Sequence, residues 1–104
     1  MASEWTERLG FYRGRVYYLT VRVTPSLNDV RGFAAVLYYA PETTPERKIQ
    51  VARIDTTHGY THFDRHYRRD RPKERIDVDV WEAAALLKAN WRTYAERFED
   101  LDRT

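Results

Sequence analysis

The C-terminal part of the chain carries its clearest pattern, a stripe of apolar residues at helical spacing. Apolar side chains recur there at alternating steps of four and three, at Val80, Ala84, Leu87, Trp91, Tyr94, Phe98 and Leu101. This spacing predicts one face of an α-helix of about five turns, and charged residues such as Lys88 and Glu96 occupy the opposite face. Asp79 and Glu82 form a capping box at its start. Because the stripe must be buried, the rest of the chain has to supply the surface that the helix covers.

The residues before this helix alternate with the period of β-strands. In residues 15–24, for example, Tyr17, Leu19 and Val21 alternate with neighbours that face the other way. The same reasoning predicts four more strands, at residues 33–39, 48–55, 60–68 and 74–78. The links between the strands are short and contain Pro or Gly at residues 25–29, 41–45 and 57–59, which favours antiparallel hairpins.

The N-terminal segment carries a different local signal. Ser3 is suited to the N-cap of a helix and Gly10 to the residue that follows a helix, so one or two helical turns are predicted over residues 3–9. A length of 104 residues corresponds to one domain spanning residues 1–104. The predicted fold class is therefore α+β: an antiparallel sheet of four to five strands with one C-terminal amphipathic helix packed on one face.

Composition limits the class of protein further. The chain is 42% hydrophobic and 14% aromatic, which is too apolar for a disordered protein. It has no cysteine, which excludes disulfides and thiolate nucleophiles. The N-terminus has no signal-peptide pattern, and the longest apolar stretch, residues 33–40, is too short to span a membrane. These features predict a cytoplasmic protein with no membrane partner.

Positive charge is concentrated near one segment, although the net charge of the chain is only +2. Six basic residues crowd this segment: Arg65, Arg68, Arg69, Arg71, Lys73 and Arg75. The planar guanidinium group of arginine matches phosphate geometry, so this segment is a candidate nucleic-acid contact. An arginine-rich genome explains the same excess equally well.

All three histidines, His58, His62 and His66, lie within nine residues of one another. On an extended strand, Tyr60, His62, Asp64, His66 and Arg68 share one side of the sheet. Thr61, Phe63 and Tyr67 then point to the opposite side, toward the core and the helix. Arg53 and Asp55 share a face of the preceding strand, but the sequence does not fix whether that face is the histidine face.

Three interpretations of this cluster remain open at the level of sequence. The first is an ordinary solvated face of an antiparallel sheet. The second is metal-free cleavage of RNA, in which histidines transfer protons and arginines stabilise the charge on phosphate. His62 and His66 would lie roughly 13 Å apart at Cα along such a strand and would flank the phosphate. The third is a metal site that combines Asp64 and a neighbouring histidine with Asp55 or His58.

The sequence of residues 51–59, Val-Ala-Arg-Ile-Asp-Thr-Thr-His-Gly, resembles the TumE-type toxins of prokaryotic toxin–antitoxin systems. The resemblance continues through His62 and His66 to the helix near Trp91 and Phe98, and covers about the second half of the chain. It implies ribonuclease-like growth inhibition and a cognate antitoxin as partner. Asp55, His62 and His66 are the matching positions. Two features depart from the family pattern: a threonine follows Asp55 where the family often has asparagine, and the histidines are more widely spaced.

Together these observations predict a ribonuclease-like toxin that needs no cofactor and acts on RNA. The predicted catalytic residues are His62 and His66 as the acid–base pair, with Asp55 or Asp64 orienting an imidazole. The predicted nucleic-acid-binding residues are Arg53, Arg68, Arg69, Arg71 and Tyr60. The alternatives are a non-enzymatic interaction module, either a homodimer or a partner-binding domain, and a metal-binding domain that uses the His/Asp cluster.

Overall fold

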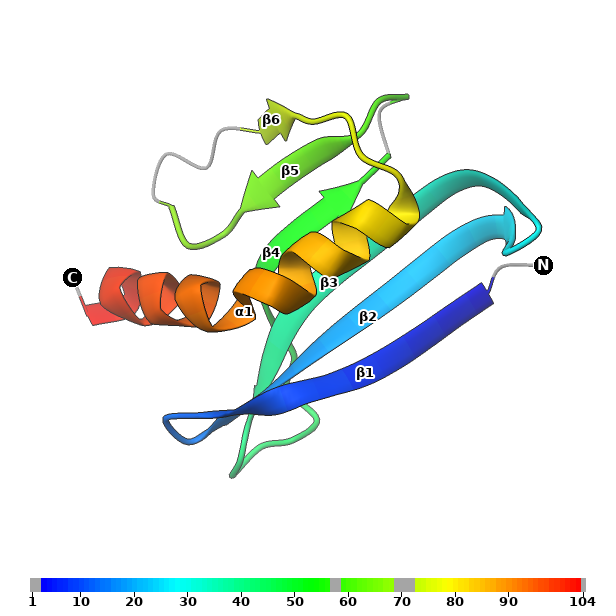
Figure 1. Cartoon of the computed structure of the whole chain (residues 1–104). Coiled ribbons are helices and arrows are strands. Elements are labelled where there is room, and N and C mark those ends of the chain that lie inside the picture. Colours follow the sequence, from blue (N-terminus) through cyan, green and yellow to red (C-terminus); the bar gives the residue numbers. More distant parts are fainter. Residues whose placement is uncertain (1–2, 57–58, 69–72, 104) are drawn as a thin grey trace.

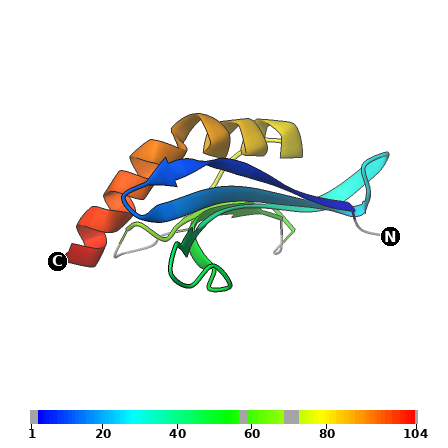
Figure 2. The same ribbon diagram turned by 90° about the horizontal axis from the view of Figure 1, so that it is seen from below.

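A computed structural model describes residues 3–56, 59–68 and 73–103. Six strands form one antiparallel sheet in the order of the sequence. They are β1 (Ser3–Tyr12), β2 (Arg15–Ser26), β3 (Asp29–Pro41), β4 (Ile49–Asp55), β5 (His62–Arg65) and β6 (Lys73–Arg75). The single helix in the described residues, α1 (Val80–Arg103), runs across one face of the sheet (Figures 1 and 2). The predicted α+β fold is confirmed, with six strands instead of four to five.

The helix begins and packs as its sequence predicts. The backbone N–H of Glu82 donates to Asp79 Oδ1 at 2.8 Å, and the N–H of Asp79 donates to Glu82 Oε1 at 3.1 Å, which completes the capping box. From the apolar stripe, Val80, Leu87 and Tyr94 are buried. They pack on a sheet face built largely from alternate residues of β2 to β5, including Tyr17, Leu19, Val21, Leu37, Ile54 and Phe63.

The first strand contradicts the prediction of helical turns at residues 3–9. β1 pairs along its length with β2, and Trp5 lies opposite Val21. This long-range pairing outweighs the local capping signals of Ser3 and Gly10. Gly10 has a different role, because a Cβ there would lie 2.8 Å from Cζ2 of Trp91. The glycine therefore lets the helix pack closely against the edge strand, beside the register shift between Arg8 and Gly10.

Two other boundaries differ from the predicted ones. β5 spans His62–Arg65 instead of residues 60–68, and β6 spans Lys73–Arg75 instead of residues 74–78. β5 is short because the chain turns after Arg65, where the N–H of Arg68 donates to the carbonyl of Arg65 at 3.1 Å. This early turn changes the positions of the predicted site residues that follow it.

The described part of the chain contains no helix that is both long and apolar enough to cross a membrane.

Candidate functional site

The pairing of β4 with β5 determines which side chains lie beside the histidines. Asp55 pairs with His62, and Arg53 pairs with Asp64. Directly opposed residues in an antiparallel pair point to the same face, so all four lie on one side of the sheet. Ile54 and Phe63, the pair between them, point into the core with the helix. The polar residues therefore occupy the sheet face that the helix leaves uncovered.

Asp55 and His62 form a buried pair at the centre of this face. Nε2 of His62 lies 2.7 Å from Oδ1 of Asp55, and their side chains are only 3% and 5% exposed. Nε of Arg53 donates to the other carboxylate oxygen of Asp55. The ring of Tyr60 packs near His62, with 5.6 Å between ring centroids. One carboxylate thus holds an imidazole and a guanidinium together, and His62 is anchored in the sheet.

Of the two histidines in the described residues, His66 is more exposed than His62, and it lies in a turn. Its Nε2 lies 3.4 Å from Oδ2 of Asp64, and its side chain is 20% exposed. Its backbone N–H donates to the carbonyl of Val51 at 3.0 Å. Val51 is the extra residue at a register shift in β4, where Leu37 pairs with Ala52 and Tyr38 with Gln50. The prediction of an extended strand from His62 to His66 is wrong, because the strand ends at Arg65 and a turn places His66.

One pocket of about 290 Å³ brings these groups together on the uncovered face. It contains all four predicted catalytic residues and one of the predicted arginines; its lining is Gln50, Arg53, Asp55, His62, Asp64, His66 and Lys73. Gln50 and Lys73 are not among the residues predicted to join the histidine cluster. Lys73 comes from β6 and lies opposite Asp64, a pairing that requires knowledge of the β5–β6 register.

The pocket's charge depends on its imidazoles. Arg53 and Lys73 contribute two positive charges, and Asp55 and Asp64 contribute two negative charges, so these four cancel (2 − 2 = 0). Protonation of either histidine then makes the pocket cationic. A pocket of this kind can hold an anion and exchange a proton with it, whereas the same pocket with neutral histidines attracts anions weakly.

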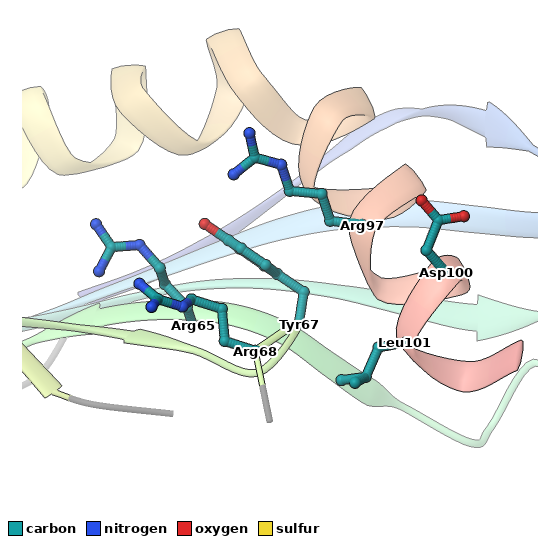
Figure 3. Close-up of a pocket in the computed structure, with 6 residues that line it drawn as sticks. All are labelled: Arg65, Tyr67, Arg68, Arg97, Asp100 and Leu101. Carbon is teal, nitrogen blue, oxygen red and sulfur yellow. The ribbon is translucent and has the colours of Figure 1, made fainter. Parts of the chain in front are cut away.

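Tyr60 and Arg68, the other predicted nucleic-acid-binding residues in the described part of the chain, do not line this pocket. Tyr60 is 38% exposed and lines a neighbouring depression, where Cζ of Arg75 lies 5.3 Å from its ring centroid. Arg68 does not share the histidine face as predicted, because it follows the turn; it lines a different pocket with Arg65 and Arg97 (Figure 3). Arg69, Arg71 and His58 lie outside the described residues.

A metal site has little support in the described part of the chain. No group of three or more His, Asp or Glu side chains there is arranged to hold a metal ion. Asp55 is already engaged by His62 and Arg53, and Asp64 lies beside His66. The proposed metal ligand His58 lies outside the described residues.

The fold and the pocket define a class of small α+β domain with one helix on one face of the sheet and a His/Asp pocket on the other. The chain belongs to DUF7718, a family described as a domain of unknown function, whose model matches residues 1–104. No curated protein and no solved structure matches the chain. The family match carries no link to the TumE-type toxins, so that resemblance stays a prediction.

Proposed function

We propose that this domain is a metal-independent endoribonuclease that binds an RNA phosphate in the His/Asp pocket. The observation that supports the proposal is that two His–Asp pairs and two cationic side chains from three strands and a turn share one pocket. Imidazole groups transfer protons near neutral pH, and guanidinium and ammonium groups stabilise negative charge on phosphate. The resemblance to TumE-type toxins implies the same class of reaction.

The burial of each group assigns the roles within this proposal. His66 is the proton-transfer group, because it is the more exposed of the two histidines that line the pocket, and Asp64 orients its ring. It removes the proton from the ribose 2′-hydroxyl, whose oxygen attacks phosphorus while the bond to the 5′ oxygen breaks. The leaving 5′ oxygen takes a proton from water in the pocket, and the hydroxide that remains takes back the proton held by His66, which regenerates the neutral imidazole. Arg53 and Lys73 contact the phosphate, and the buried His62–Asp55 pair positions Arg53.

The first test is cleavage of a single-stranded oligoribonucleotide by the purified chain in the presence of EDTA. The proposal predicts cleavage that EDTA leaves unchanged and products with 2′,3′-cyclic phosphate ends, since the 2′-hydroxyl is the nucleophile. A 2′-O-methyl oligonucleotide of the same sequence is the matched control and is expected to stay intact. Cleavage of the methylated strand, or no cleavage of the RNA, would contradict the proposal.

A second candidate function, self-association, is favoured by the free edge of the sheet. β1 is an edge strand of ten residues, and Glu4, Thr6 and Arg8 on it are exposed. Such an edge can pair with another strand through its backbone. In an antiparallel pair of two β1 strands centred on Thr6, each Glu4 lies opposite Arg8 of the second copy. Beside this edge, Trp81 is 57% exposed and stacks on Trp5 with 5.8 Å between ring centroids.

Charge exchange on β1 tests this register. If β1 pairs with a second copy, the Arg8→Glu and Glu4→Arg variants each oppose like charges and shift the protein toward monomer. The double variant restores opposite charges and is expected to recover the dimer. Arg31→Glu, which reverses a charge that is 78% exposed in its side chain, serves as the control. Sedimentation equilibrium measures the dissociation constant, and a monomeric wild type would exclude this interface.

A further inference from the structure

The second notable pocket lies between the end of β5 and the C-terminal half of α1, and it is lined by arginines. Its volume is about 610 Å³, and its lining is Arg65, Tyr67, Arg68, Arg97, Asp100 and Leu101. Figure 3 shows the side chains of Arg65, Arg68 and Arg97 extending toward the same side as the hydroxyl end of Tyr67. Nothing in the proposed cleavage reaction uses this cluster.

An aromatic stack forms the base of this arginine pocket. Tyr67 is 6% exposed and stacks on Tyr94 of the helix, with 5.1 Å between ring centroids and 14° between planes. Burial raises the pKa of Tyr94, and nearby Tyr67 adds to this, while Arg65 and Arg97 act in the opposite direction. Tyr67, which lines the pocket, is thus packed against the helix through this stack, and Arg65 and Arg97 lie close to it.

Two of the arginines lie near aromatic rings. Cζ of Arg65 lies 4.2 Å from the ring centroid of Phe63, and Cζ of Arg97 lies 5.9 Å from that of Tyr67. A guanidinium group beside a ring keeps N–H donors for an anion. Nη1 of Arg65 also lies 2.5 Å from Oε2 of Glu74, which further restricts that side chain. The donors are thus partly ordered before any ligand binds, which reduces the entropy cost of binding.

The charged side chains of the arginine pocket favour the binding of an anion. Three of the six residues that line the pocket are arginines and one, Asp100, is acidic, so its described lining carries more positive than negative groups without any proton uptake. The His/Asp pocket becomes cationic only after a histidine is protonated. The arginine pocket therefore offers an anion site that persists above neutral pH.

We infer that the arginine pocket binds a phosphate group of the same RNA strand whose cleavage is proposed above, away from the scissile position. This identification of the ligand rests on the proposed ribonuclease function. The two pockets adjoin along the chain, because His66 lines the first and the next two residues, Tyr67 and Arg68, line the second. For this, one RNA strand must pass around the turn after β5, from the uncovered face of the sheet to the helix side, and contact both pockets. The arginine pocket then sets affinity and the position of the strand, and the His/Asp pocket carries out the chemistry.

The test compares an Arg68→Gln/Arg97→Gln double variant with an Arg22→Gln/Arg31→Gln double variant of equal charge. The control arginines are 62% and 78% exposed in their side chains, and both lie away from the arginine pocket. Fluorescence anisotropy with a 2′-O-methyl oligonucleotide measures binding without cleavage. We expect the pocket variant to bind roughly tenfold more weakly, and its log–log salt slope to be smaller by about 1. Equal affinities of the two double variants would overturn the inference.

A titration with inorganic phosphate separates this inference from the proposed cleavage. In ¹⁵N–¹H NMR spectra of wild type, phosphate is expected to shift the amides of Arg65, Arg68 and Arg97, and the shifts are expected to be lost in the pocket variant. Such shifts in a protein that cleaves no RNA would support the anion site and reject the proposed function. RNA cleavage by a protein without these shifts would support the proposed function and reject the site.

Discussion

The Asp55→Ala variant is expected to lose about 1–3 kcal/mol of unfolding free energy, the cost of leaving the buried polar partner of Asp55 without its carboxylate. Asp55 accepts from Arg53 and lies 2.7 Å from Nε2 of His62, and the side chains of Asp55 and His62 are 5% and 3% exposed. Without the carboxylate, the buried imidazole loses the group that its Nε2 contacts. Urea unfolding followed by circular dichroism measures the difference.

Asp64→Ala is the matched control for this measurement. Asp64 is the other carboxylate of the pocket, but its side chain is 14% exposed and lies at the longer distance of 3.4 Å from His66. Its removal is expected to cost about 1 kcal/mol or less, as for ion pairs that water reaches. Equal losses in the two variants would mean that burial of the Asp55–His62 pair adds no stability, and that both carboxylates have only a local role.

The parts of this fold that could be predicted are those with local signals. The helix is specified by its capping box at Asp79 and Glu82 and by one apolar stripe, and both depend only on neighbours within a few residues. β1 could not be predicted in this way, because its ends carry helix-cap residues at Ser3 and Gly10. Only its pairing with β2 and the approach of Trp91 to Gly10 explain the observed strand.

The candidate site was predictable in its residue types but not in its geometry. The histidine cluster and its acidic neighbours stand out in the sequence, and four of these residues, His62, His66, Asp55 and Asp64, do line one pocket. The positions of His66 and Lys73, however, depend on the register shift at Val51 and on the β5–β6 pairing. Neither the register shift nor the strand pairing can be predicted from the sequence of one strand alone. For the same reason the sequence could not indicate that His62 is buried while His66 meets solvent.

The largest loss of cleavage activity is expected when His66 is replaced. If His66 is the proton-transfer group, His66→Asn retains a polar side chain in the turn but cannot take up a proton, and the cleavage rate at saturating protein falls about 10²–10⁴-fold. Its unfolding free energy is expected to stay within about 1 kcal/mol of wild type, because the half-buried ring adds only its contact with Asp64 to a turn that the backbone already holds.

His62→Asn is the control variant for His66→Asn, because the two histidines of the pocket differ chiefly in the burial of their side chains. We expect His62→Asn to lower both stability and activity, because it removes the ring that pairs with Asp55 inside the sheet. A catalytic role for His66 therefore requires that its variant be inactive while it unfolds at the same urea concentration as wild type. If His66→Asn cleaves RNA at the wild-type rate while His62→Asn is folded and inactive, the proton-transfer role belongs to His62, and the pocket must open during the reaction to expose it.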